Sequence, residues 1–222
     1  MKIDTVTICS GGLDSSTLLY LLREEGRQQA VVTFDYGQRH RREIDCARYH
    51  AWSLGLSHRV VDLRPTFSHM VSALLEGAQQ EVPTIEDVLG DPQPPTYVPF
   101  RNQIFLSVAC GIAESLGAQT VAYGAQRHDL YGYWDTTDEF IERFQSLIGL
   151  NRKTSLTLYA AFVGYSKEEI VREGLRLGVN FRHTWSCYRG GSRACGRCPT
   201  CSERLAAFSR VGVPDPLEYD VT

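Results

Sequence analysis

The chain has 222 residues, of which 43% are hydrophobic and 22% are charged, and its formal net charge is −3. This length accommodates one substantial α/β domain with a small appended module, and the composition excludes a disordered protein. The slightly acidic balance argues against a protein that binds the nucleic-acid backbone, because such proteins normally present a basic face.

The first third of the chain alternates predicted strands and helices. An apolar, β-branched run predicts a strand over residues 3–9, and a leucine stripe predicts a helix over residues 15–25. Residues 30–35 and 59–63 are typical of two further strands, with a helix expected between them at 41–54. Such strands, apolar throughout, belong to a parallel sheet that is covered on both faces.

Regular signals weaken between residues 64 and 99. Five prolines lie in the second half of this segment and exclude long helices or strands there. A segment of this length inside a compact domain is usually a lid or a binding loop, so it is predicted to be a substrate loop with a short helix near 69–76.

The second half returns to the same alternation. Helices are predicted over residues 102–116, 137–148 and 166–177, and a strand over 120–123. Ser166 and Glu169 have the spacing of a capping box at the start of the last helix. The fold class is therefore α/β, a doubly wound, mostly parallel sheet with helices on both faces. Residues 1–180 are expected to form this domain, and 181–222 a C-terminal metal-binding segment packed on it.

A glycine-rich string, Ser10-Gly11-Gly12-Leu13-Asp14-Ser15, follows the first predicted strand. The first strand-to-helix turn of an open parallel sheet is a favoured phosphate site, and glycines let the backbone approach an anion closely. The start of the next helix adds free N–H groups, and Asp14 beside a phosphate suggests a magnesium ion between them. The alternative is a tight turn in which Asp14 and Ser15 only cap the helix. The residues expected to form this phosphate site are Cys9, Ser10, Gly11, Gly12, Leu13, Asp14, Ser15, Ser16, Thr17, Leu18 and Leu19.

Four of the seven cysteines lie close together in the last forty residues, at Cys187, Cys195, Cys198 and Cys201. Four thiolates and no histidine fit a closed, tetrahedral structural zinc site, one per chain, and an iron–sulfur cluster is the competing interpretation. In a reducing compartment, such crowding of cysteines indicates metal binding rather than cross-linking. No stretch approaches the ~20 apolar residues of a membrane-spanning helix, and the N-terminus lacks the apolar core of a signal peptide. The expected location is the cytoplasm. The other three cysteines are expected to be core residues.

The string from Ser10 to Ser15 resembles the signature of the PP-loop ATP pyrophosphatases. In that superfamily ATP is cleaved between its α and β phosphates, and AMP is transferred to an oxygen of the substrate. The resemblance therefore implies that the residues of the phosphate site, from Cys9 to Leu19, bind ATP. Further motifs narrow the resemblance: Phe-Asp-Tyr-Gly-Gln-Arg-His at 34–40, Pro-Phe-Arg-Asn at 99–102, and Thr-Trp-Ser-Cys-Tyr at 184–188, with Arg204 after the cysteines. Together they are similar to the 7-cyano-7-deazaguanine synthase family over nearly the whole chain.

The resemblance implies an ATP-dependent ligase that forms C–N bonds. ATP adenylates 7-carboxy-7-deazaguanine, ammonia displaces AMP to give an amide, and a second activation by ATP leads to the nitrile. The implied cofactors are ATP, Mg²⁺ and Zn²⁺, and the implied assembly is a homodimer. The residues expected to be catalytic or to bind substrate are Asp35, Tyr36, Gln38, Arg39, His40, Arg101, Asn102, Asp129, Tyr133, Asp135 and Lys167.

The residue types support these roles unevenly. The planar guanidinium of Arg101 suits a phosphate or a carboxylate. Without the resemblance, Lys167 would be read as a solvated lysine, and His40 equally well as a surface residue or a proton carrier. The loop at 130–137 also departs from the family's usual run at Trp134, Thr136 and Thr137, and Phe100 replaces a glycine commonly found there.

These departures leave three alternatives open. One is a divergent paralogue that stops at the amide or joins the deazaguanine acid to another amine. A second is a PP-loop enzyme that thiolates tRNA, although the acidic balance makes a nucleic-acid partner unexpected. A third is a zinc-stabilised binding module with a vestigial loop, against which the intact Asp14 and loop serines argue.

Overall fold

The computed structural model describes residues 2–91, 93–126 and 133–220. Its centre is a five-stranded sheet in which every pair of neighbouring strands is parallel. The strands are β1 (Thr5–Ile8), β2 (Gln29–Asp35), β3 (Ser57–Asp62), β4 (Thr120–Tyr123) and β5 (Thr157–Tyr159), in the order β3-β2-β1-β4-β5. The chain moves outward from β1 in both directions, so the carboxyl ends of β1 and β4 flank the crevice where such sheets bind ligands.

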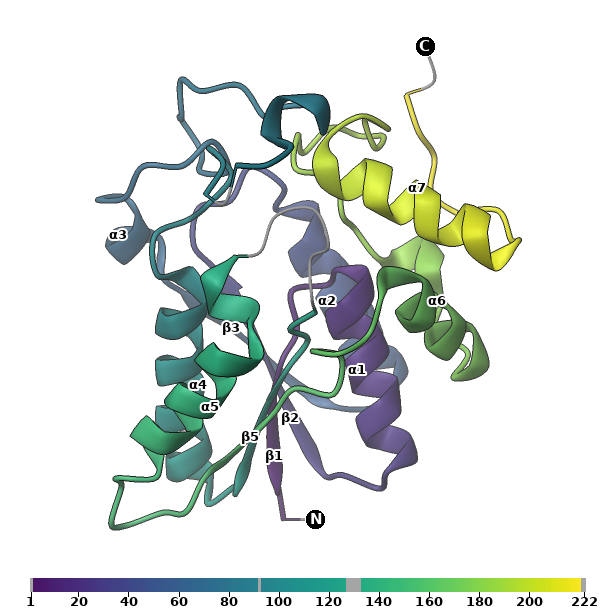
Figure 1. The fold of residues 1–222 in the computed structure, drawn as a ribbon. Coiled ribbons are helices and arrows are strands. Elements are labelled where there is room, and N and C mark those ends of the chain that lie inside the picture. The colour runs from purple at the N-terminus through teal and green to yellow at the C-terminus, as the bar shows by residue number, and fades with distance from the viewer. Residues whose placement is uncertain (1, 92, 127–132, 221–222) are drawn as a thin grey trace.

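Helices cover both faces of the sheet, as Figure 1 shows. On one face lie α4 (Arg101–Leu116) and α5 (Asp138–Ile148); on the other lie α1 (Leu13–Glu24), α2 (Arg42–Ser53) and α6 (Lys167–Arg176). A last helix, α7 (Pro199–Val211), packs on α6. The doubly wound architecture predicted from strand–helix alternation is confirmed.

Successive strand residues alternate between the two layers. Val6 and Val32 contact the core under α4 and α5, whereas Val31 contacts the core under α1 and α2. On the α1 side, Leu18 and Leu22 are fully buried. Burying one such leucine stabilises the fold by about 1.5–3 kcal/mol. Leu18 and Leu22 therefore fix α1 against the sheet, and with it the position of the loop that precedes α1.

Most predicted boundaries agree with the structure within a few residues. The capping box is confirmed: Ser166 accepts from the N–H of Glu169, whose carboxylate accepts from the N–H of Ser166. Besides short helical turns, the strand β5 and the helix α7 were missed. The strand β5 has only three residues and one buried side chain. The helix α7 was hidden by the cysteine motif, although Pro199 in its first turn and Gly212 as its C-cap are ordinary helix signals.

The predicted helix near 69–76 is wrong. The short helices of this segment are α3 (Arg64–Phe67) and a 3₁₀ turn, η1 (Glu86–Val88), while residues 69–76 form turns. Their backbone groups bond to distant segments: Arg39 N–H donates to the Leu74 carbonyl at 2.9 Å, and Ala73 N–H donates to the Pro95 carbonyl at 2.8 Å. Long-range backbone hydrogen bonds take the place of the i to i+4 hydrogen bonds of a helix.

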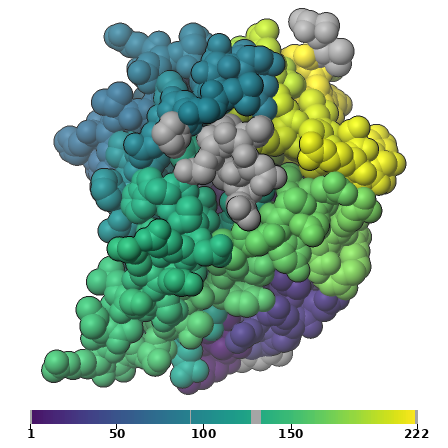
Figure 2. All heavy atoms as spheres, in the orientation of Figure 1, coloured from purple at the N-terminus to yellow at the C-terminus, as the bar shows by residue number. Residues whose placement is uncertain are grey.

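The 64–99 segment and the C-terminal segment lie side by side at the same end of the molecule (Figure 2). Two further 3₁₀ turns, η2 (Trp134–Thr136) and η3 (Phe181–His183), precede α5 and the cysteine region. No helix in the described ranges is both long and apolar enough to cross a bilayer. The expected division at residue 180 stays a prediction.

Candidate active site

The loop between β1 and α1 is ordered by its own serine hydroxyls. Ser10 N–H donates to Ser15 Oγ at 3.2 Å, the two Oγ atoms lie 3.1 Å apart, and Gly12 N–H donates to Ser10 Oγ at 3.2 Å. Gly12 is the N-cap of α1 and supplies no capping side chain. The first N–H groups of the helix therefore point into the loop without a side-chain cap, which is the arrangement that binds anions.

Gly11 has a packing role that its motif did not suggest. Its φ is +88°, and a Cβ built there would lie 1.9 Å from the carbonyl oxygen of Glu43 and 2.7 Å from the nitrogen of Ala47. The missing side chain thus lets the first turn of α2 pack directly on the loop. Gly124, after β4, similarly lets that strand's end approach Ser15, whose nitrogen would lie 3.0 Å from an added Cβ.

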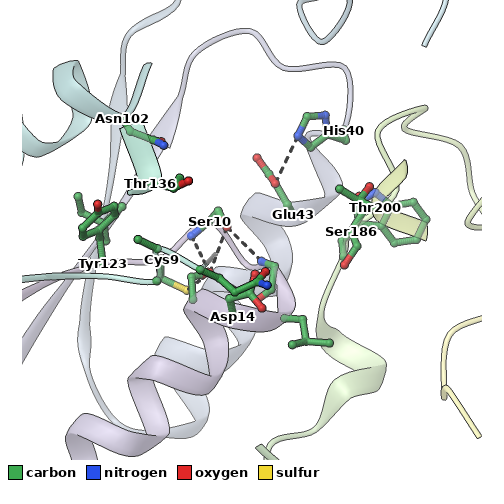
Figure 3. Close-up of a pocket in the computed structure, with 18 of the residues that line it drawn as sticks. Cys9, Ser10, Asp14, His40, Glu43, Asn102, Tyr123, Thr136, Ser186 and Thr200 are labelled. Atoms are coloured by element: carbon green, nitrogen blue, oxygen red, sulfur yellow. Dashed lines mark hydrogen bonds and ion pairs between the residues drawn. The ribbon is translucent and has the colours of Figure 1, made fainter. Parts of the chain in front are cut away.

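A cavity of about 240 Å³ opens above this loop. Its walls are the PP-loop, the starts of α2, α4 and α6, the residues that follow β4, and part of the segment 185–204. Figure 3 shows Cys9, Ser10 and Asp14 on one side and Asn102 and Thr136 above them. Of the residues expected to bind ATP, Cys9, Ser10, Gly12, Leu13, Asp14 and Ser15 line it, whereas Gly11, Ser16, Thr17, Leu18 and Leu19 do not.

Asp14 and Lys167 form an ion pair on the cavity wall. Lys167 Nζ donates to Asp14 Oδ2 at 2.6 Å, and neither side chain is more than a quarter exposed. Lys167 is the first residue of α6, so the capping box at Ser166 fixes where its side chain begins. The reading of Lys167 as a solvated lysine is therefore wrong. In the described part of the chain, the buried Asp14 Oδ1 has no hydrogen-bond partner, which leaves it able to accept one from a ligand or bind a cation.

Arg101 begins α4 on the opposite wall. Its guanidinium donates to the Tyr36 hydroxyl at 3.3 Å and lies 5.7 Å from the centre of the Tyr36 ring. Burial raises the pKa of Tyr36 to about 12, so its phenol is neutral. Arg101 and Lys167 thus supply cationic groups on two sides of the loop, as a polyphosphate requires.

Asp135 and Tyr133 lie behind this wall. They line a small recess beside Arg101 and not the main cavity, and the Tyr133 hydroxyl lies 2.8 Å from Thr96 Oγ1. Burial raises the pKa of the Asp135 carboxyl, while Arg101 and Asn102 act in the opposite direction. The structure thus places Asp135 next to cavity residues without exposing it to the cavity.

The motif at 34–40 sends its side chains in two directions. Tyr36 and His40 line the cavity. Asp35 accepts from Arg41 at 2.7 Å, and Arg39 donates to the carbonyls of Leu75, at 3.2 Å, and Ala78.

Gln38 is fully buried and also bonds within the protein, to Phe34 and Glu43. Asp35, Gln38 and Arg39 therefore hold the fold around the cavity and are absent from its lining. Asp129 lies outside the described residues, and the predicted contacts with ATP and substrate stay predictions.

Several cavity residues were missed by the sequence reasoning. Glu43 was overlooked because an acid in the first turn of a helix is normally read as a helix-stabilising charge. Tyr123 is the last residue of β4 and Gln126 follows that strand, so the rule that ligands bind at the carboxyl ends of strands could have found both. Trp185 and Ser186 belong to a motif that was used for the family resemblance alone.

The four cysteines converge beside the cavity. Their sulfur atoms all lie within 4.8 Å of one another, and Cys187, Cys198 and Cys201 are buried. Backbone N–H groups of Cys195 and Cys198 point at the sulfurs of Cys187 and Cys195, each at 3.3 Å. Cys198 and Cys201 come from the start of α7, Cys198 as its N-cap, and Cys187 comes from the irregular segment between η3 and α7. This donor set fits a metal ion held by four thiolates.

Comparison with known proteins gives consistent matches. The family model described as queuosine biosynthesis protein QueC matches residues 4–212. A 7-cyano-7-deazaguanine synthase of Caldicellulosiruptor bescii is 41% identical over 217 residues, covering 97% of both chains. One from Rhizobium meliloti is 41% identical over 218 residues, covering 97% of this chain and 92% of its own.

More distant solved structures share the fold. The NMN synthetase of Francisella tularensis has a TM-score of 0.54 at 11% identity, covering 95% of this chain and 78% of its own. The U34-tRNA thiolase NcsA of Methanococcus maripaludis, with its [4Fe-4S] cluster, has a TM-score of 0.51 at 14% identity, covering 94% and 65%. At such identities the likeness concerns the fold alone. The near full-length family match and the curated relatives, however, show that the chain belongs to the family of queuosine biosynthesis protein QueC.

Proposed function

We propose that the chain converts 7-carboxy-7-deazaguanine and ammonia into 7-cyano-7-deazaguanine, with ATP activating first the acid and then the amide. The relatives that align over nearly the whole chain are named for this synthase activity. The structural observation that carries the proposal is the cavity in which the PP-loop meets the Asp14–Lys167 pair and Arg101.

The chemistry explains why such a cavity is needed. A carboxylate is a poor electrophile, and its acyl-adenylate is a good one because AMP is a stable leaving group. The loop donors and the start of α1 suit the ATP phosphates, while Lys167 and Arg101 suit the charge that develops as pyrophosphate departs. A walled cavity also limits hydrolysis of the adenylate by water.

Two metal ions complete the proposal. The unpartnered Asp14 Oδ1 suits Mg²⁺, a hard cation that prefers oxygen, and bound Mg²⁺ would neutralise phosphate charge. Cys187, Cys195, Cys198 and Cys201 would hold one structural zinc ion per chain, because four thiolates leave no open position for water. Metal analysis of the purified protein tests the second assignment: one zinc per chain is expected, and iron would contradict it.

The remaining expectations rest on the family likeness alone. We propose a homodimer in the cytoplasm, which sedimentation analysis and cell fractionation test. No specific observation favours the paralogue, tRNA-thiolating or binding-module alternatives. The altered loop does contribute Thr136 to the cavity, so the identity of the product needs a direct measurement.

Product mass is that measurement. The protein is incubated with ATP, magnesium, ammonium and 7-carboxy-7-deazaguanine, and the products are followed by mass spectrometry. The nitrile is expected, and a reaction that ends at the amide would contradict the proposal. Asp14→Asn should abolish product formation, whereas Asp45→Asn should not, because Asp45 is an exposed residue of α2.

A further inference from the structure

Glu43 is a buried carboxyl group on the cavity wall. It belongs to the first turn of α2 and is only 8% exposed, yet it lines the cavity. Figure 3 shows its side chain extending from the start of α2 toward His40, on the same side as the PP-loop at Ser10. Burial of a charged carboxyl group is unfavourable unless the group is paired, so a buried carboxyl on a cavity wall suggests a ligand or a catalytic role.

One oxygen of this carboxyl is fixed by the protein. Gln38 Nε2 donates to Glu43 Oε1 at 3.0 Å. Gln38 is itself fixed, since its amide accepts from Tyr36 N–H at 2.9 Å and donates to the Phe34 carbonyl at 3.1 Å. The carboxyl therefore has a set orientation before any ligand binds.

The other oxygen is available. Glu43 Oε2 lies 3.5 Å from His40 Nε2, which is longer than an ordinary N–H···O hydrogen bond. Burial and the nearby Arg101 lower the pKa of His40 to about 3, so the imidazole is neutral and adds no positive charge. Oε2 can thus accept a further hydrogen bond from a small donor in the cavity.

Glu43 differs from Asp14, the carboxylate beside the loop. Asp14 is held by the ammonium group of Lys167. Across the described ranges, Glu43 forms no ion pair with a lysine or an arginine. Burial raises the pKa of Glu43 to about 8, against the opposing effects of Arg101 and Gln38. Without a bound cation, Glu43 at neutral pH is therefore mainly the neutral carboxylic acid. Near pH 8 and above it is the carboxylate, which is a stronger base than an exposed glutamate and attracts a small cation, and the charge of that cation in turn favours the ionised form.

We propose that the Glu43 carboxylate binds the ammonium ion and accepts its proton, which frees the nitrogen lone pair to attack the acyl-adenylate. This inference rests on the proposed function. The nitrogen forms a bond to the acyl carbon as the bond from carbon to the phosphate oxygen breaks. AMP takes the electron pair of that bond, and the second nitrogen proton passes to its phosphate. Gln38 is a positioning residue, because its hydrogen bond to Glu43 Oε1 orients the carboxyl group so that Oε2 is free to accept a bond from the ammonium ion.

Separating the two half-reactions tests the proposal. Glu43→Gln keeps the shape and can still bond to Gln38. Its adenylation, measured as exchange of pyrophosphate into ATP with the acid but without ammonium, should stay within about 3-fold of the unaltered protein. Its amide formation from ammonium in a single turnover should fall by about 10²–10⁴-fold. Hydroxylamine is neutral at the pH of the assay and needs no deprotonation before it attacks. It should therefore restore acyl transfer in Glu43→Gln.

The controls make each outcome decisive. Asp45→Asn, an exposed acid in the same turn of α2, should leave every step unchanged. Equal amide formation by Glu43→Gln and the unaltered protein, or equal loss of adenylation and amide formation, would overturn the role of Glu43 while leaving the proposed function intact. No amide from the unaltered protein would instead refute the proposed function.

If Glu43→Gln does not fold, Glu43→Asp is the variant for the same two measurements. Its carboxyl is one methylene shorter, so a partial loss with ammonium and a normal rate with hydroxylamine are expected.

Discussion

Arg204 and Asp215 form an ion pair that solvent hardly reaches, with side-chain exposures of 1% and 2%. The pair is bidentate: Nε donates to one carboxylate oxygen at 2.7 Å and Nη2 to the other at 2.9 Å. Arg204 also donates to Thr184 Oγ1 at 2.7 Å, and Tyr219 donates to Asp215. These bonds connect residues 215–219 to α7 and to the start of the cysteine region.

Replacing Asp215 by Asn would leave the guanidinium buried with only neutral acceptors. Removing one partner of a buried pair costs about 3–5 kcal/mol, because the remaining charge loses its compensation. For a chain of this size that loss corresponds to a fall in Tm of about 6–20 °C. With m in urea of about 2–3 kcal/mol/M, the urea midpoint should fall by about 1–2.5 M.

Urea unfolding of the metal-loaded protein measures this loss. Arg176→Met is the matched control, because Arg176 pairs with Glu24 where both side chains are about half exposed, and its shift should be small by comparison. The double variant Arg204→Met with Asp215→Leu should recover much of the stability, since it removes both charges. An Asp215→Asn midpoint indistinguishable from that of the unaltered protein would refute the reasoning.

Three further predictions concern the site and the core. Lys167→Met should slow adenylation by about 10²–10³-fold in pyrophosphate exchange, whereas the exposed Lys153→Met should not, and equal rates would contradict a phosphate role for Lys167. Gly11→Ala should lower the free energy of unfolding in urea by about 2–4 kcal/mol, because the added Cβ would clash with the Glu43 carbonyl. Gly26→Ala is the control: Gly26 also has a positive φ but open space around it, so the loss should be about 1 kcal/mol. Equal losses would contradict the packing argument. Burial lowers the pKa of His50 to about 4, so between pH 6.5 and 4 the unfolded chain binds more protons and stability falls as pH falls. The slope of the unfolding free energy against pH in this window should be shallower in His50→Gln, and an unchanged slope would rule out His50 as its source.

Local signals were sufficient for much of the fold. The strand over residues 120–123 and the capping box at Ser166 and Glu169 were predicted closely, because a buried run and a cap are properties of neighbouring residues. The segment 64–99 resisted prediction for the opposite reason. Its backbone groups bond to Arg39 and Gly37, outside the segment, and across the segment from Ala73 to Pro95, so no local pattern predicts its shape.

The candidate site divides in the same way. The PP-loop and the four cysteines were recognisable because each places its donors within a short stretch of chain. Lys167 is separated from Asp14 by 153 positions, and only the packing of α6 beside α1 brings its ammonium group to 2.6 Å from that carboxylate. Apart from the family resemblance, nothing in the sequence distinguished it from a solvated lysine.

The sequence by itself determined the class of chemistry, because an anion-binding turn and a metal-binding knuckle are local arrangements of donors. Tertiary structure decided which charges surround that turn. Gly11 allows α2 to pack on the loop, and this contact places the buried Glu43 on the cavity wall. Burial and long-range distance set the electrostatics of a site, and neither is written in the spacing of residues along the chain.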